Sequence, residues 1–476
     1  MASKDNTVQL DPSHQSAPPR GWWECGYLVK LNIGIVCLTF LSSTNGYDSS
    51  LLNGLQALPG WLEFMEHSSS VWLGFINALY WIGAATITLA AATVANRFGR
   101  KKGIWLGYIC LILGTILQTA APNVACFIVA RLFTGAAMGW MNNSTPVLIA
   151  EVAYPSHRGI ASALYMTSYY IGSIVAAWVT FGTRTWDSSW AWRFPSILQF
   201  LMPTLALPAL FLEARQTLIT HHAGGDATLP WIDNELRSIQ HAIAVEFEAE
   251  KHSTYSELIR TPGHRHRLFI TITLGFYDQW AGNGPLSYYL ALVLKAIGVT
   301  KTRDQLLISA CLQVWNLPWA LAAALSVNRM GRRKLFLLSA GIMLVSYIIM
   351  TGLSGSFATT ANFRDGDRYG AVYLCLFCWT PLLTAYPCEI WPFRLRSRGL
   401  MVTWMSCIIA VIFNTFVNPI AMDAIGWKYY IVYLVLLIFW CLITYLWYPE
   451  TRGLSLEDVA VRVERFSKEL QNAISY

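Results

Sequence analysis

An acidic and a basic residue lie within long apolar runs of this sequence, where an ionisable side chain is costly. Asp48 comes late in the first run, and Arg131 is the only Lys or Arg in the fourth run. Burial favours the neutral form of a carboxyl group, whereas a nearby guanidinium favours the charged form. A conformational change that alters the distance between the two groups would therefore make Asp48 bind and release a proton. The alternative is a static ion pair that fixes helix packing.

A second polar pair, Asp278 and Gln279, lies in the seventh apolar run. The amide of Gln279 can donate and accept hydrogen bonds, which suits adjacent hydroxyl groups such as those of a sugar. The alternative for Gln279 is a hydrogen bond that packs two helices together. Asp278 is a second acidic partner, a direct ligand of hydroxyl groups, or a residue that faces water near a helix break.

The sequence GNGP at 282–285 follows this pair and cannot hold a regular helix well, since Gly is flexible and Pro lacks an N–H group. We therefore expect a helix break. Unwound backbone at membrane depth is tolerated only where it lines a cavity or is buried in protein. The break indicates a central binding site, with Tyr288 and Tyr289 as its outer gate.

The composition indicates that these residues belong to a membrane protein. The chain has 476 residues, of which 55% are hydrophobic and 13% charged, about half the roughly 25% charge of a soluble domain. Twelve apolar runs are long enough to span a bilayer. They lie at about residues 28–52, 71–93, 104–121, 125–147, 160–181, 193–212, 268–293, 305–326, 335–354, 370–390, 400–421 and 427–447. The predicted fold is an all-α membrane protein with twelve transmembrane helices.

Charge and cysteine usage argue against several other classes of protein. The formal net charge is +7, but the basic residues form short clusters between apolar runs, which the positive-inside rule explains without a nucleic-acid partner. Cys375 and Cys378 have no second CxxC or His pair, so no metal site is expected. Isolated histidines such as His67 and His264, and the lack of a GxxxxGK[ST] sequence, argue against an enzyme or an ATP-driven pump. No cofactor is expected.

The basic clusters predict how the chain is oriented in the membrane. They lie at 97–102, 260–267, 329–334 and 394–398. If the chain crosses the membrane twelve times, all four clusters and both termini lie on the same side of the membrane. The positive-inside rule places that side in the cytoplasm. The predicted domains are a cytoplasmic N-terminal tail at 1–26, a six-helix bundle at 27–212, a cytoplasmic helical insert at 213–265, a second six-helix bundle at 266–448 and a cytoplasmic C-terminal tail at 449–476.

The two predicted bundles look like copies of one another. The pairs Tyr-Asp and Asn-Gly within 47–54 recur with the same spacing within 277–284, and NRFGRKK at 96–102 returns as NRMGRRK at 328–334. Many secondary transporters are built from repeated units, with the substrate site at the interface between them. The repeat therefore predicts two pseudo-symmetric six-helix bundles around a central site.

Six stretches of the sequence carry a family resemblance. They are GYDSSLLNGLQALPGW at 46–61, NRFGRKK at 96–102, RLFTGAAMGWMNNSTPVLIAEVAYPSHRG at 131–159, DQWAGNGPLSYYL at 278–290, NRMGRRK at 328–334 and WTPLLTAYPCEIWPFRLRSRG at 379–399. Together with PETRG at 449–453, they resemble the sugar-porter family of the major facilitator superfamily, and within it they are similar in sequence to fungal lactose and hexose permeases. The resemblance implies a secondary active transporter that imports a hexose or disaccharide by proton symport.

The resemblance also implies roles for individual residues. Asn283 is displaced by one position from the family's sugar-binding asparagine, and Trp379 and Asn414 lie on helices that face the cavity in relatives. Trp379 is a candidate to stack on a pyranose ring; the alternative is a core or interface anchor. The residues that match the family's cytoplasmic latch are Arg97, Arg100, Glu151, Arg158, Arg329, Arg332, Glu389, Arg396 and Glu450. The alternative for the arginines is a purely topological role.

Two departures from the family pattern leave other functions open. The sequence LEARQ follows the sixth apolar run in place of the family's PESPR motif, and Met166 stands where relatives tend to carry an amide that faces the substrate. The alternatives are a non-transporting sugar sensor and an exporter or uniporter of a less polar metabolite. The main prediction is a monomeric, multi-pass importer of the plasma membrane whose partners are a small sugar, a proton and the lipid bilayer.

Overall fold

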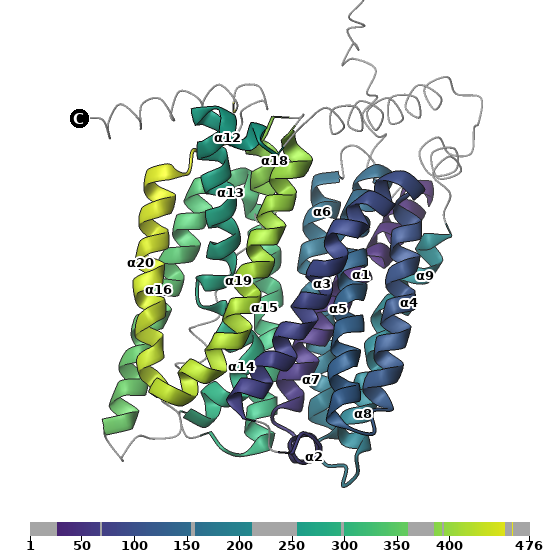
Figure 1. Ribbon diagram of the computed structural model, residues 1–476, viewed down its shortest axis with the longest axis vertical. Helices are drawn as coiled ribbons and strands as arrows, with labels where there is room; N and C mark the ends of the chain where they lie inside the picture. The colour runs from purple at the N-terminus through teal and green to yellow at the C-terminus, as the bar shows by residue number, and fades with distance from the viewer. Residues whose placement is uncertain are drawn as a thin grey trace, which may run out of the picture.

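The computed structural model describes residues 26–66, 69–153, 158–211, 255–296, 299–359, 385–392, 395–452 and 459. Helices account for most of these residues, and no strand occurs among them. Figure 1 shows two groups of helices standing side by side, the N-terminal group in purple and blue and the C-terminal group in green and yellow. The predicted all-α fold is confirmed.

Each group contains long helices together with shorter ones in series. The N-terminal group consists of α1 (Gly26–Leu55), α2 (Pro59–Phe64), α3 (Ser70–Phe98), α4 (Arg100–Thr119), α5 (Val124–Val152), α6 (Arg158–Thr167), α7 (Tyr169–Thr183), α8 (Trp190–Ile197), η4 (Leu198–Phe200) and α9 (Leu201–Leu210). The C-terminal group consists of α12 (Glu257–Arg260), α13 (Pro262–Trp280), α14 (Asn283–Ala296), α15 (Thr302–Met330), α16 (Arg332–Thr359), α18 (Ala385–Ile390), α19 (Arg396–Ile425), η7 (Gly426–Lys428) and α20 (Tyr429–Trp447).

The helices agree with the predicted membrane spans. In the described residues, 7 helical segments are long and apolar enough to cross a membrane, and one of these covers both α19 and α20. Three further predicted spans consist of shorter helices in series, namely α6 with α7, α8 with α9, and α13 with α14. The predicted span at 370–390 lies outside the described residues except for α18. The architecture is that of the predicted twelve-helix fold.

Local sequence explains where several helices begin. The side chains of Asn123 and Thr261 each accept a hydrogen bond from a backbone N–H in the first turn of α5 and α13, respectively. Pro262 follows at the first position of α13, where its missing N–H costs nothing. In the duplicated loops, Gly99 and Gly331 have φ of +93° and +90°, a region that favours glycine. This repeated turn separates α3 from α4 and α15 from α16.

Each group of helices has its own apolar core. Leu274 and Leu437 are buried in the core of the C-terminal group, whereas Leu41 and Trp192 belong to two clusters in the N-terminal group. The cluster around Trp192 also contains Ala291 of α14, so the two groups pack against each other there. The two groups therefore have largely separate cores and also pack against each other, mainly through α3 with α19 and α7 with α15.

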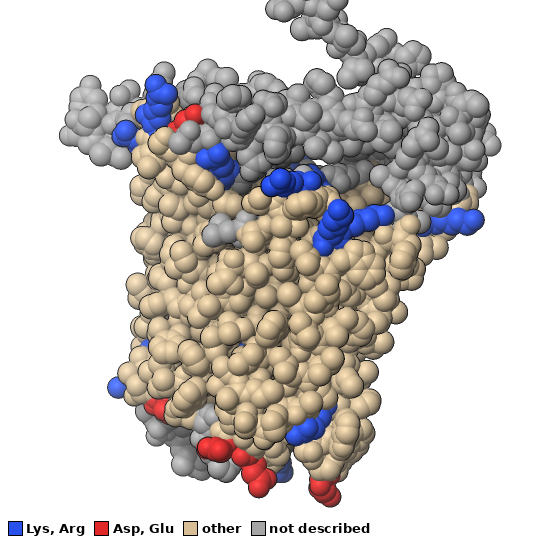
Figure 2. All heavy atoms as spheres, turned by 45° about the vertical axis from the view of Figure 1, so that its right-hand side comes forward, with Lys and Arg blue, Asp and Glu red and all other residues tan. Residues whose placement is uncertain are grey.

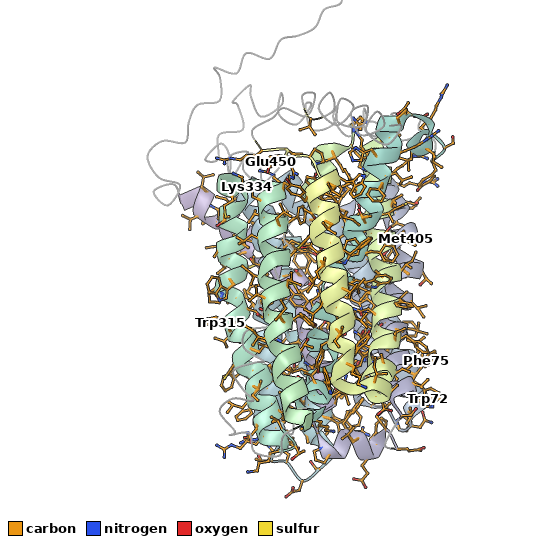
Figure 3. All side chains as sticks on the ribbon, turned by 90° about the vertical axis from the view of Figure 1, so that its left-hand side faces the viewer. Trp72, Phe75, Trp315, Lys334, Met405 and Glu450 are labelled. Carbon is orange, nitrogen blue, oxygen red and sulfur yellow. The ribbon has the colours of Figure 1, made fainter. Side chains whose placement is uncertain are left out.

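The outer surface is apolar across its middle and charged at its two ends. Figure 2 shows Lys and Arg gathered at one end of a broad uncharged band and both signs of charge at the other end. In Figure 3, Lys334 and Glu450 mark the first end, while Trp72 and Trp315 project outward; these tryptophans are 50% and 43% exposed. An apolar band of this kind suits a lipid environment.

Two names are used below for the charged ends. The basic end is the one that carries Arg97, Arg100, Arg332, Arg333 and Lys334, and the mixed-charge end is the one that carries Glu63, Arg184, Asp187, Arg303 and Asp304. Helix α1 begins and α20 ends at the basic end (Figure 1). Most of the predicted insert at 213–265 lies outside the described residues, as do both predicted tails for most of their length, and the domain boundaries stay predictions.

Candidate functional site

Asp48 and Arg131 form an ion pair in the interior of the N-terminal group. Arg131 Nη1, from α5, lies 2.6 Å from Asp48 Oδ1, on α1. The two residues are 1% and 3% exposed. Removing one member of such a buried pair leaves an uncompensated charge, which is strongly destabilising. The expected pairing is present in the structure, whereas its role in proton coupling stays a prediction.

Further polar groups surround this ion pair. Gln199 Nε2 donates to Asp48 Oδ1 at 3.1 Å, and the Arg131 guanidinium lies 4.8 Å from the centre of the Tyr80 ring. Tyr80 in turn donates to Asn45 Oδ1 at 2.9 Å. The second carboxylate oxygen of Asp48, Oδ2, is buried and has no hydrogen-bond partner among the described residues. Oδ2 is therefore the oxygen at which Asp48 can take up a proton without losing an existing hydrogen bond.

Sequence reasoning missed Gln199, although a signal was available. Gln199 is the only amide residue in the apolar run at 193–212. A buried amide in a membrane span needs a polar partner, so its position alone marks it as a candidate. Its partner could not be predicted, because α1 and η4 are brought together only by the tertiary fold.

The predicted break in the seventh span is confirmed. Helix α13 ends at Trp280, and α14 begins at Asn283. Between them Gly282 has a φ of +100°, which a residue with a side chain rarely adopts. A second irregularity follows at Tyr289, whose φ of −137° and ψ of 30° are not helical. The span is therefore divided close to the predicted substrate residues.

Asp278 and Gln279 lie at the end of α13, next to this break. Both are 8% exposed, and Gln279 Nε2 donates to Asp278 Oδ2 at 2.7 Å. Cys407 of α19 completes the cluster, with its Sγ 3.5 Å from Asp278 Oδ2 and 3.6 Å from Gln279 Nε2. Sequence reasoning missed Cys407, because a cysteine in an apolar run carries no signal of its own.

The other predicted substrate residues differ in their surroundings. Asn283 is half-buried, and its Oδ1 has no hydrogen-bond partner in the part of the chain that the structure describes. Asn414 is 3% exposed, and both ends of its amide contact other residues of the protein. Trp379 lies outside the described residues. Met166 packs against the apolar core of the N-terminal group.

Tyrosine side chains lie near both acidic residues of the site. Tyr80 lies close enough to Asp48, and Tyr288 close enough to Asp278, for the carboxylate charge to act on the phenol, and Tyr169 lies near both tyrosines. These tyrosines come from α3, α7 and α14, so both groups of helices contribute to the set. Their hydroxyl groups can donate and accept hydrogen bonds.

Three hydrogen bonds join the two groups of helices toward the mixed-charge end. They involve polar side chains of α1, of the turn directly after α1 and of α3 on one side, and the irregular part of α14 on the other. We call them the clasp: Leu290 N–H to Asn53 Oδ1 at 3.1 Å, Gln56 Nε2 to the Tyr288 carbonyl at 3.0 Å, and Asn77 Nδ2 to the Tyr289 hydroxyl at 3.0 Å. The predicted gate residues thus contact the opposite half, and their gating role stays a prediction.

Glu450 is the best-defined member of the predicted latch. Its carboxylate accepts hydrogen bonds from the backbone N–H groups of Arg332 at 2.9 Å and Arg333 at 3.2 Å. These groups lie in the first turn of α16, where the helix dipole favours a negative charge. Arg100 Nη1 donates to the Ala95 carbonyl at 3.1 Å, and Arg97 is exposed. The latch as a network stays a prediction, since the structure does not describe the side chains of Glu151, Arg158, Arg329, Glu389 and Arg396.

The described side chains offer hydrogen bonding and proton binding, and they gather no metal ligands. Within the described ranges, no three His, Cys, Asp or Glu side chains lie close enough together to hold a metal ion. The arrangement has one charge-paired carboxylate, Asp48, and a second polar cluster around Gln279. A role of the first in proton binding and of the second in substrate binding stays a prediction.

Comparisons with known proteins agree with this arrangement. The model of a family described as sugar (and other) transporter matches residues 34–462. The MFS-type transporter oryC of Aspergillus oryzae is 27% identical over 460 residues, covering 90% of this chain and 84% of the relative. The low-affinity glucose transporter HXT3 of Saccharomyces cerevisiae is 25% identical over 469 residues, covering 91% of this chain and 82% of the relative.

Solved structures show the same fold. The inward open conformation of the xylose transporter XylE from E. coli matches with a TM-score of 0.72 and 20% identity, covering 90% of this chain and 98% of that chain. The proton:xylose symporter XylE bound to 6-bromo-6-deoxy-D-glucose matches with a TM-score of 0.68 and 20% identity, with the same coverage of 90% and 98%. At this identity, the likeness concerns the fold alone.

Proposed function

Because this chain belongs to the sugar (and other) transporter family of the major facilitator superfamily, we propose that it imports a hexose or disaccharide together with a proton. The family and the fold are those of membrane transporters rather than of enzymes. A relative named as a glucose transporter and a structural neighbour named as a proton:xylose symporter support a sugar and a proton as the transported species.

The observation that carries the proposal is the buried ion pair between Asp48 and Arg131. Arg131 and Gln199 hold one oxygen of the carboxylate, while the other has no partner among the described residues. Protonation of Asp48 removes the charge that attracts Arg131, so proton binding and ion pairing compete. A conformation that strengthens the pair therefore releases the proton, and one that weakens the pair binds it.

The sugar is proposed to bind at the break between α13 and α14. Gln279 supplies an amide, Asp278 a carboxylate and Asn283 a further amide oxygen that has no partner among the described residues. Trp379, which lies outside the described residues, is proposed as a stacking group for the sugar ring. The tyrosines between Asp48 and Asp278 supply additional hydroxyl groups.

Alternating access is proposed to couple the two sites. The clasp is proposed to keep the mixed-charge end closed, so that release in this conformation is toward the basic end. Opening of the clasp, together with closure of the latch through Glu450 and its partners, would expose the site to the opposite side. The charge distribution supports a cytoplasmic basic end, because basic residues favour that side. In this orientation both termini lie in the cytoplasm. The protein is proposed to be a monomer in the plasma membrane.

A second candidate is an exporter or uniporter of a less polar metabolite. Its support is that Met166 is apolar and that the Aspergillus oryzae relative carries the general name MFS-type transporter. A non-transporting sugar sensor is the third reading. These candidates differ in what they do to a sugar gradient and in whether they need a proton gradient.

Uptake measurements separate the three candidates. Radiolabelled hexoses, disaccharides and polyols are offered to cells that lack their own sugar transporters, with and without a protonophore. A proton symporter accumulates one of these sugars, and the protonophore abolishes the accumulation. Uptake that only equilibrates and ignores the protonophore supports a uniporter. Specific sugar binding without uptake supports a sensor, and neither binding nor uptake refutes the sugar proposal.

A further inference from the structure

The divided seventh span leaves backbone carbonyl groups that its own helix cannot satisfy. The last carbonyls of α13 lose their helical partners because the chain turns at Ala281 and Gly282. In a membrane span, such groups need partners from the protein, since lipid offers none. Two neighbouring helices supply them. Asn414 Nδ2 of α19 donates to the Gln279 carbonyl at 2.9 Å, and the Tyr347 hydroxyl of α16 donates to the Gly282 carbonyl.

Asn414 is itself held in place by two residues behind it. Its Oδ1 accepts a hydrogen bond from the Tyr433 hydroxyl of α20 at 2.9 Å. The Tyr433 hydroxyl also donates to Asn418 Oδ1 at 2.8 Å, and Asn418 Oδ1 accepts a second hydrogen bond from the Tyr429 hydroxyl at 2.7 Å. A tyrosine hydroxyl has one proton to donate. The Tyr433 proton is therefore shared between the Asn414 and Asn418 oxygens, and Tyr433 holds the two amides together.

The packing around this chain of bonds leaves little room for another arrangement. Asn414, Asn418 and Tyr433 are 3%, 0% and 2% exposed. A Cβ atom added at Gly284 would lie 2.0 Å from Asn414 Nδ2 and 3.1 Å from Asn418 Nδ2. The Asn414 and Asn418 amides can therefore approach the start of α14 only because residue 284 is a glycine. With Oδ1 bonded to Tyr433, the amide nitrogen of Asn414 points to the Gln279 carbonyl.

We infer that Asn414, Asn418 and Tyr433 form a positioning network that fixes the end of α13 and so aims the Gln279 side chain at the substrate. The carbonyl that Asn414 holds belongs to the same residue as the amide proposed to bind the sugar. Anchoring that carbonyl limits the positions of the Gln279 Cα and side chain. Asn414 therefore acts through Gln279 and is a positioning residue, whereas the sequence predicted a direct ligand. The inference rests on the proposed function for the identity of the substrate.

The test uses Tyr433→Phe in the full-length protein, since this change removes one hydroxyl and keeps the ring. We expect the KM for the transported sugar to rise about three- to tenfold, the factor that corresponds to one neutral hydrogen bond, with kcat changed by less than about twofold. Hydrogen exchange of the backbone at 279–285 should rise as well. The double variant Tyr433→Phe/Asn414→Ala should match Asn414→Ala alone, because both residues act through one chain of bonds.

The control is Tyr277→Phe, which removes a buried hydroxyl from α13 itself. That hydroxyl donates to the Phe336 carbonyl at 3.2 Å, a hydrogen bond that involves neither Asn414 nor Tyr433, so KM should stay at the parent value. An unchanged KM and unchanged exchange in Tyr433→Phe, or additive effects in the double variant, would overturn the inference. If the parent protein takes up no sugar while Tyr433→Phe still raises backbone hydrogen exchange at 279–285, the proposed function fails. The network would then still be shown to stabilise the break between α13 and α14.

Discussion

The clasp should set how often the mixed-charge end opens, and Asn53→Ala tests this most sharply. Asn53 Oδ1 accepts the N–H of Leu290, the residue directly after the non-helical Tyr289. Asn53 and Leu290 are 3% and 1% exposed. The variant therefore leaves a buried backbone donor without its partner for as long as this end is closed.

The size of the effect follows from that geometry. An unsatisfied buried donor costs about 1–3 kcal/mol, and the cost falls only on the closed state, since water reaches Leu290 when the end opens. The open-to-closed ratio should then rise roughly 5- to 140-fold. Gln56→Ala removes a neutral hydrogen bond worth about 0.5–1.5 kcal/mol, so its ratio should rise by a smaller factor, roughly 2- to 12-fold.

Single-molecule fluorescence energy transfer can measure this ratio. Fluorophores are attached through unnatural amino acids at Glu63 of α2 and Arg303 of α15, two exposed positions of the mixed-charge end. The control is Asn143→Ala, which removes an amide that donates to the Thr88 carbonyl at 3.2 Å within one half. We expect a larger low-transfer population in Asn53→Ala and Gln56→Ala but not in the control. Equal populations in all four proteins would refute the role of the clasp.

Three further variants test other parts of the account. Gln279→Ala should raise KM or abolish uptake at equal surface expression, because a lost hydrogen-bond pair in a buried site costs about 1–3 kcal/mol; unchanged kinetics would remove Gln279 from the site. Glu450→Ala should lower the free energy of unfolding by about 1–2 kcal/mol, since the first turn of α16 loses its acceptor, and a Tm in detergent equal to that of the parent would contradict this. Gly282→Ala should lower the free energy of unfolding by about 1–3 kcal/mol, because alanine disfavours the positive φ and its Cβ would contact the Tyr347 ring. The control is Gly341→Ala, which has open space around the added Cβ and should leave Tm within about a degree or two of the parent value.

Features that depend on local sequence could be predicted. Asp48 and Arg131 stood out because a charged side chain in a membrane span is costly. Their pairing could be predicted because each buried charge needs an opposite charge nearby. The break at 282–285 follows from the backbone chemistry of Gly and Pro, and it occurs within one residue of the start of that stretch. The apolar runs predicted where the helices lie, because lipid demands long apolar segments.

Features that depend on which helices meet could not be predicted. Cys407 joins the cluster at Asp278 only because α19 packs against α13. The partners of Asn53 and Gln56 are backbone groups of α14, which give no signal in the sequence. Asn414 was predicted as a sugar ligand from resemblance, and the contacts from which a supporting role is inferred, with the Gln279 carbonyl and Tyr433, depend on the tertiary fold. In each case the partner came from the tertiary fold, and for Cys407 the residue type gave no signal either.

Accumulation of sugar driven by a pH gradient, in proteoliposomes of the parent and of Asp48→Asn, tests the central claim most directly. Asn resembles the protonated carboxyl in shape and neutrality, so sugar exchange down a gradient should survive in the variant. The parent should concentrate sugar by up to about tenfold per pH unit, since one proton contributes about 1.4 kcal/mol per unit, while the variant should reach only equilibrium. Accumulation by Asp48→Asn equal to that of the parent, at matched exchange rates, would contradict proton coupling through Asp48.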